Sequence, residues 1–146
     1  MLNQILLPIG ISGSSYIIYN FNKIKSKIGN YQNNVINYNQ YKHYIKTDYA
    51  QKYLSIIKYD NYFPIFYGLV YYSLNSQLIN NILALILIII HSLLDWIENL
   101  YNYRFITGKS ALSIKHYRGY TSIKKLKIFM IIINTTLTLL SIYRFF

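Results

Sequence analysis

Two long apolar runs constrain this chain more than any other feature. Residues 78–103 contain the run LALILIII, and residues 126–143 read LKIFMIIINTTLTLLSIY. An apolar run of about 18 or more residues is typical of a helix that crosses a bilayer, because only helices and closed barrels satisfy their backbone hydrogen bonds in lipid. Polar and apolar residues do not alternate here as they do in barrel strands. The sequence therefore predicts an all-α membrane protein.

A third run, at residues 55–74, reads SIIKYDNYFPIFYGLVYYSL and is followed by a polar turn at 75–77. We expect a membrane-anchor domain at 55–146 with three transmembrane helices, at about 55–74, 78–103 and 126–143. Residues 1–54 form a basic extension rich in Tyr, Asn and Lys, and its apolar start is interrupted by Pro8, Gly10 and Gly13. We expect that start to dock on the membrane surface or on a partner.

The charges test this topology. The chain has 15 Lys and Arg against 4 Asp and Glu, and fourteen of the 15 lie in residues 1–58 and 104–127. Three spans would place these two regions on one side of the membrane and Arg144 on the other, which is a positive-inside distribution. This explains most of the +11 charge without a nucleic-acid partner. The stretch KHYRGY at 115–120 predicts contact with an anionic phospholipid such as cardiolipin.

The residue types also limit the chemistry. Without cysteine, the chain holds no disulfide and no iron–sulfur cluster of its own. We find no Gly-rich phosphate loop, nucleophile constellation or zinc spacing, and we expect no catalytic residue. The abundance of Ile, Asn, Lys, Tyr and Phe is typical of an A/T-rich genome, which favours an organelle-encoded protein.

The most apolar predicted helix carries a polar face. At 100° per residue, His91, Asp95, Glu98 and Asn102 fall within an arc of about 60°. Ionisable groups at membrane depth are costly, and they face a bundle interior, a cofactor or a water path. A histidine there has three uses: an axial ligand of haem iron, a proton relay with carboxylates, or a hydrogen bond that holds helices together.

The register of this helix resembles that of the small membrane-anchor subunit of succinate dehydrogenase, CybS of respiratory complex II. The family pattern is close to H-x3-G-x2-Q-x3-D-Y, and this chain has His91, Asp95, Glu98, Asn102 and Tyr103 at those positions. His91 and Tyr103 match by identity, while Glu98 stands for Gln and Asn102 for Asp. The short turn before the helix, the basic loop after it and the closing apolar helix are also similar to that subunit.

The resemblance implies a role for each matched residue. His91 resembles the axial ligand of haem b, whose second ligand comes from a larger anchor subunit. Tyr103 resembles the tyrosine that donates a hydrogen bond to ubiquinone, with Asn102 as its neighbour in the quinone site. Asp95 departs from the family glycine and adds bulk and charge where a flat macrocycle would approach.

The resemblance thus predicts a membrane-anchor subunit of a mitochondrial succinate dehydrogenase in the inner membrane, with its amino terminus on the matrix side. Its partners would be the larger anchor, iron–sulfur and flavoprotein subunits, and its cofactors ubiquinone and haem b. The alternative is a structural membrane subunit of another respiratory complex, in which Asp95 and Glu98 pair with basic groups on a neighbouring helix. A conducting helix bundle is less attractive, because too few spans are polar.

Overall fold

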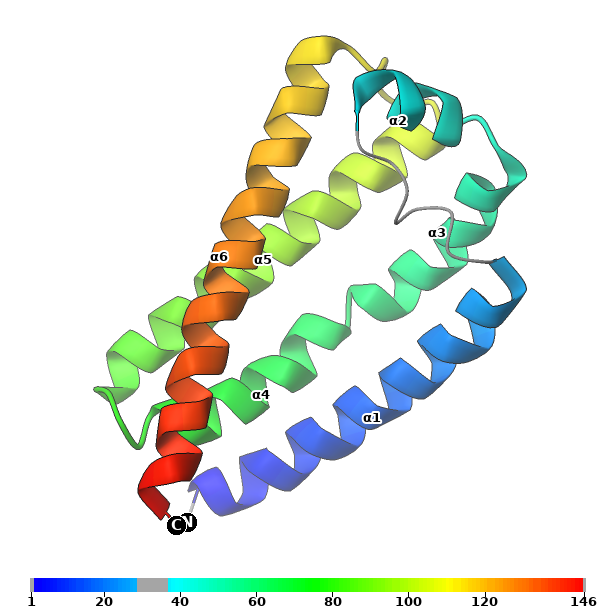
Figure 1. The fold of residues 1–146 in the computed structure, drawn as a ribbon. Coiled ribbons are helices and arrows are strands. Elements are labelled where there is room, and N and C mark those ends of the chain that lie inside the picture. The colour runs from blue at the N-terminus through cyan, green and yellow to red at the C-terminus, as the bar shows by residue number, and fades with distance from the viewer. Residues whose placement is uncertain (1, 29–36, 146) are drawn as a thin grey trace.

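The computed structural model describes residues 2–28 and 37–145, which form six helices and contain no strand. The all-α prediction is therefore confirmed for the described part of the chain. The helices are α1 (Leu2–Ile28), α2 (Tyr38–Tyr44), α3 (Asp48–Asp60), α4 (Phe63–Asn75), α5 (Asn81–Ile106) and α6 (Ile114–Phe145). α4 packs against α1, α5 and α6, so it lies at the centre of the bundle (Figure 1).

The first helix belongs to this bundle. α1 lies along α4 (Figure 1), and two glycines allow the close approach. A Cβ added at Gly10 would lie 2.8 Å from the carbonyl oxygen of Phe66, and one added at Gly13 would overlap the Phe66 ring. Small residues at a helix interface let two backbones approach closely. The apolar start of the chain thus packs on the chain's own α4.

The predicted span at residues 55–74 is wrong, because two short helices occupy this region. α3 ends at Asp60, and α4 begins at Phe63 with Pro64 in its first turn. Proline lacks the N–H group and fits the first turn of a helix, where that group has no partner within the helix, so Pro64 favours a new helix start here. Each helix has 13 residues, or roughly 20 Å at 1.5 Å per residue, which is shorter than the ~30 Å hydrocarbon core of a bilayer.

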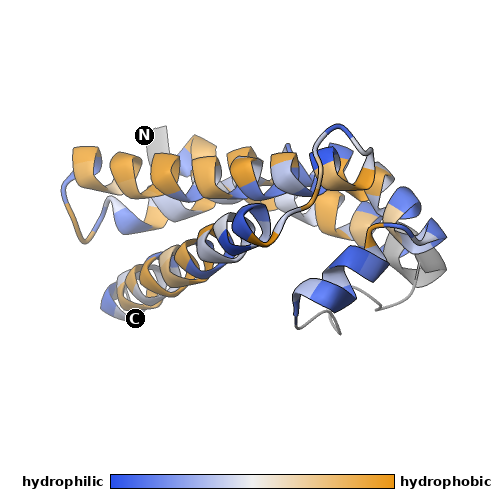
Figure 2. Cartoon of the chain, turned by 90° about the horizontal axis from the view of Figure 1, so that it is seen from above, coloured by the Kyte–Doolittle hydropathy of each residue, from blue (hydrophilic) through white to orange (hydrophobic). Residues whose placement is uncertain are grey.

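In the described part of the chain, two helices are long and apolar enough to cross a membrane, at Asn81–Ile106 and Ile114–Arg144. α5 is displaced by about one turn from the predicted 78–103. α6 begins at Ile114, well before the predicted residue 126. The basic stretch that we assigned to a loop forms the first turns of this helix. Figure 2 shows hydrophobic residues along most of α5 and in the C-terminal part of α6.

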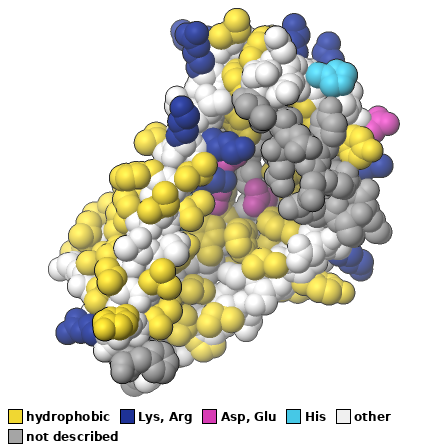
Figure 3. Space-filling view, viewed as in Figure 1, with side chains coloured by type: hydrophobic (Ala, Val, Ile, Leu, Met, Phe, Trp, Pro, Cys, Tyr) yellow, Lys and Arg dark blue, Asp and Glu magenta, His cyan; other side chains and the backbone are white. Residues whose placement is uncertain are grey.

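A hydrophobic cluster, which we call the aromatic cluster after its four aromatic members, joins α2 to the end of α5 and the start of α6. Its buried members are Tyr41, Tyr44, Ile45, Ala50, Phe105, Ile106 and Tyr120. The Tyr41 and Tyr120 rings stack with their centroids 5.1 Å apart. Lys and Arg gather over this end of the molecule, whereas hydrophobic side chains cover most of the opposite end (Figure 3). The bundle thus has a basic end and an apolar end.

Candidate functional site

The polar face of α5 points inward. His91, Asp95, Glu98 and Asn102 are all buried, with 6% or less of each residue exposed. They follow one another along the helix and contact different neighbours, so they form three groups: His91 beside α4 and α6, Asp95 and Glu98 beside α6, and Asn102 beside α2.

The His91 imidazole is enclosed by aromatic rings and an amide. Its ring centroid lies 4.8 Å from that of Tyr67 and 6.0 Å from that of Tyr71, both on α4. The Asn134 Nδ2 group of α6 lies 3.4 Å from His91 Nδ1. An amide nitrogen can only donate, so Nδ1 accepts this bond and the imidazole proton is on Nε2.

This arrangement does not fit a haem ligand. A histidine that ligates iron through Nε2 needs a proton on Nδ1, which it donates to an acceptor. Here Nδ1 faces a donor, and only 2% of His91 is exposed. Tyr67 and Tyr71 pack against the imidazole ring. His91 instead fits the third use considered from the sequence, a hydrogen bond that holds helices together.

Asn134 belongs to a wider amide network between α4 and α6. Its Oδ1 accepts a hydrogen bond from Asn75 Nδ2 at 3.2 Å, and its Nδ2 also lies 3.1 Å from the Met130 carbonyl oxygen. Asn75 Oδ1 in turn accepts from Thr138 Oγ1 at 2.9 Å. These bonds fix the orientation of the Asn134 amide, and therefore the tautomer of His91.

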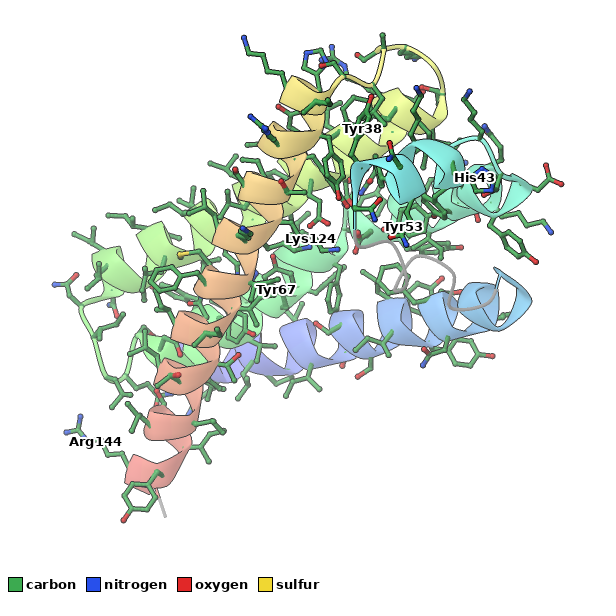
Figure 4. The ribbon with its side chains drawn as sticks, turned by 45° about the horizontal axis from the view of Figure 1, so that its top comes forward. Tyr38, His43, Tyr53, Tyr67, Lys124 and Arg144 are labelled. Atoms are coloured by element: carbon green, nitrogen blue, oxygen red, sulfur yellow. The ribbon has the colours of Figure 1, made fainter. Side chains whose placement is uncertain are left out.

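Asp95 and Glu98 pair with a lysine of their own chain. Lys127 Nζ on α6 lies 2.8 Å from Asp95 Oδ1 and also contacts Glu98 Oε2. Tyr67 lies on α4 (Figure 4), and its hydroxyl donates to Asp95 Oδ2 at 2.7 Å. Additional hydrogen bonds help to offset the cost of burying an ion pair, and the Tyr67 hydroxyl provides one to Asp95. These four side chains therefore tie α4, α5 and α6 together.

A third carboxylate stands near this ion pair. Asp60, at the end of α3, is affected by the charges of Asp95, Glu98 and Lys127. Burial is the main cause that raises the pKa of the Asp60 carboxyl to about 6, and the Asp95 charge adds to it. Three of the chain's four acidic residues thus gather where one lysine supplies the positive charge.

Asn102 lies away from the predicted quinone site. Its Oδ1 accepts a hydrogen bond from the Tyr41 hydroxyl at 2.6 Å, within the aromatic cluster. Burial raises the pKa of Tyr41, so this phenol remains a protonated donor. The structure does not bring Asn102 beside the Tyr103 hydroxyl, because successive helical residues point about 100° apart.

Tyr103 lines an open pocket of about 640 Å³. The wall of the pocket is formed by Ile57, Asn61, Tyr62, Trp96, Asn99, Leu100 and Tyr103. The indole N–H of Trp96 donates to the Asn61 carbonyl oxygen at 2.8 Å, and Asn99 Nδ2 donates to Asn61 Oδ1 at 3.2 Å. The break between α3 and α4 is therefore held against α5, and it shapes the pocket.

The Tyr103 hydroxyl contacts Lys109. It accepts a hydrogen bond from Lys109 Nζ at 3.1 Å, and the same ammonium group lies 4.9 Å from the ring centroid. The phenolic O–H proton is not used by this contact, so it can be donated to an acceptor in the pocket. About 37% of Tyr103 is exposed, which leaves it accessible from outside the chain.

The residues that contact the polar face of α5 were not predicted from the sequence. Lys127 and Asn134 interrupt the last apolar run, and either one signals a polar contact inside the bundle. Tyr67 and Tyr41 gave no such signal, because this chain contains 18 tyrosines. Asn61 and Asn99 were likewise hidden among many asparagines.

Comparisons of this chain with protein-family models, with curated proteins and with solved structures find no match.

Proposed function

We propose that this chain is a membrane-embedded, non-catalytic subunit that helps to bind ubiquinone, as the small anchor subunit of a mitochondrial succinate dehydrogenase does. The pocket beside Tyr103 is the observation that carries the proposal. A quinone headgroup is flat and offers carbonyl oxygens as acceptors. Trp96 and Tyr62 supply aromatic walls, and Tyr103 supplies the hydrogen-bond donor.

Lys109 places a positive charge next to the Tyr103 hydroxyl, which suits quinone reduction. Its ammonium group donates a hydrogen bond to the Tyr103 hydroxyl, which makes the phenol a stronger hydrogen-bond donor. Negative charge develops on a quinone oxygen as electrons arrive, and a fixed donor beside a cation stabilises that charge. The residues of this chain therefore bind and orient the quinone, and the electrons come from the iron–sulfur partner subunit.

Haem b at His91 is not included among the cofactors, because the packing around the imidazole does not fit it. The larger anchor, iron–sulfur and flavoprotein subunits remain the proposed partners, and the mitochondrial inner membrane remains the proposed location. The two helices that are long and apolar enough to cross a membrane support a place in a membrane.

The experiment replaces Tyr103 with Phe in the assembly as it is purified from its own membranes. We expect succinate-dependent quinone reduction to fall by about tenfold, the effect of one lost hydrogen bond of roughly 1–1.5 kcal/mol. Reduction of an artificial dye, which takes electrons before the quinone site, should stay near the wild-type rate. Purification without a succinate-oxidising flavoprotein would contradict the assignment to this complex.

A second candidate is a structural membrane subunit of another respiratory complex. The observation that favours it is the ion pair of Asp95 and Glu98 with Lys127, since the polar face of α5 is then satisfied by the chain itself. Under this function Tyr103→Phe leaves every electron-transfer rate unchanged. Loss of Lys127 would instead reduce the amount of assembled complex.

A further inference from the structure

A second pocket lies on α5 near the pocket beside Tyr103, at the end of the helix. It has a volume of about 290 Å³ and lies between the last turns of α5, the following loop and the start of α6. Its polar lining is Tyr101, Arg104, Ser110 and His116, and its apolar lining is Ile97, Leu100 and Phe105. The pocket therefore has a basic part and an apolar part.

The polar part is held by local contacts. The Ser110 amide donates to the Arg104 carbonyl oxygen at 3.3 Å, which folds the loop back on the end of α5. His116 Nδ1 lies 3.1 Å from the Ala111 carbonyl oxygen, so Nδ1 is the donor of this bond. The guanidinium group of Arg104 can hold a phosphate oxygen through two parallel hydrogen bonds.

The apolar part continues an exposed stripe along the membrane-length helix. Ile86, Ile90, Leu93, Ile97 and Leu100 are each between 38% and 51% exposed. At 100° per residue these five fall within about 40° on either side of Arg104. A straight path of roughly 27 Å on one face of α5 therefore leads from bilayer depth to the arginine.

We propose that this pocket binds an anionic phospholipid of the surrounding membrane. Arg104, Ser110 and His116 would hold the phosphate headgroup, and an acyl chain would lie along Ile97 and Leu100. Charge supports an anionic headgroup, because Lys109 and Lys115 flank the pocket in the sequence and no acidic residue lies between residues 99 and 146. The apolar stripe supports a lipid over a free phosphate ion, which would contact only the basic part.

The test is native mass spectrometry of the purified protein in detergent, titrated with phosphatidylglycerol or with phosphatidylcholine of the same acyl chains. We expect one phosphatidylglycerol to bind in preference to phosphatidylcholine. Arg104→Gln should weaken its binding by about tenfold, the effect of losing a charge-assisted hydrogen bond. His116→Gln, a second variant that leaves Arg104 in place, should weaken it by a smaller factor.

The matched control is Arg144→Gln, because Arg144 is an exposed arginine near the other end of α6 (Figure 4). This variant should bind phosphatidylglycerol as the wild type does. An equal loss in Arg144→Gln would mean that diffuse charge holds the lipid, and it would overturn the proposal. Equal binding of both lipids, unchanged binding in both pocket variants, or displacement by millimolar glycerol phosphate alone would overturn it as well.

Discussion

Lys127 is the residue on which the centre of the bundle depends. It is the cation that faces Asp95 and Glu98 in the described structure, and both carboxylates are buried. Two charges that repel each other in a buried place require a counter-charge, and the hydroxyl of Tyr67 supplies only a dipole. The carboxylates that the sequence placed on the polar face thus serve the chain's own packing.

Replacing Lys127 with Met should destabilise the protein by roughly 3–5 kcal/mol, because it leaves Asp95 and Glu98 buried without a counter-charge. Thermal unfolding in detergent micelles measures the effect. Lys124→Met, which removes an exposed lysine one turn earlier on α6, should change the midpoint by little. The triple variant Lys127→Met, Asp95→Asn, Glu98→Gln should recover much of the loss. A midpoint in Lys127→Met equal to that of Lys124→Met would contradict this role.

Asp60 makes stability depend on pH. Its pKa in the folded protein is about 6, whereas an unfolded aspartate titrates near 3.9. The folded state therefore binds more protons than the unfolded state between these two values, and stability falls as pH rises from about 4 to about 6. Asp60→Asn should remove this loss, since an amide keeps the shape without the charge beside Asp95 and Glu98.

The measurement for Asp60 compares unfolding midpoints of the variant and the wild type between pH 4 and pH 8. The variant should be the more stable protein above pH 6, with a gain that shrinks toward pH 4. Asp48→Asn is the control, because Asp48 lies in the first turn of the same helix, where a negative charge favours the helix dipole. A gain for Asp60→Asn that is constant over this range would show that charge is not its cause.

At the scale of the elements, the break between α3 and α4 explains one failure of the sequence prediction. Residues 55–74 are apolar on average, and we extended one helix through Asn61 and Pro64. Average apolarity does not indicate where one helix ends and the next begins, whereas Pro64 in the first turn of α4 favours a helix start at this position. The same break brings Asn61 against Trp96 and Asn99, so it builds the pocket beside Tyr103.

The contact between α1 and α4 depends on Gly10. A side chain there would meet the backbone of α4, 2.8 Å from its Cβ, and a backbone cannot rotate away as a side chain can. We expect Gly10→Leu to destabilise the protein by about 1–3 kcal/mol through overpacking. Ile11→Leu is the control, since Ile11 is 51% exposed. The measurement is the rate at which a protease cleaves α1 in the folded protein, which should be higher in Gly10→Leu than in Ile11→Leu. Equal resistance of these two variants would exclude the contact between α1 and α4.

For the whole molecule, the helical class and two apolar helices were predictable because they depend on long runs of residues. The inward face of α5 followed from its spacing. The partners of that face were not predictable, since Lys127 and Asn134 meet Asp95 and His91 only after α6 folds back along α5. The role of His91 was not predictable for the same reason, because it depends on contacts with Asn134 of α6 and two tyrosines of α4.

The two membrane-length helices predict a topology that can be measured. The loop between α5 and α6 and the loop before α5 should lie on opposite sides of the membrane, with the basic loop on the matrix or cytoplasmic side. The chain has no cysteine, so Ser110→Cys and Asn80→Cys each give a single labelling site. In sealed vesicles an impermeant maleimide should label one variant and leave the other protected. Labelling of both from the same side would contradict two spans.

If the pocket beside Tyr103 binds a quinone headgroup, Trp96 allows a direct test. Trp96 lines that pocket and is the chain's one tryptophan, so its fluorescence reports on the pocket. Titration of the purified protein with a short-chain ubiquinone should give saturable quenching, with about tenfold weaker binding in Tyr103→Phe. Tyr143→Phe, which changes an exposed tyrosine near the end of α6, should bind as the wild type does. Quenching that does not saturate, or equal affinity in all three proteins, would contradict the claim.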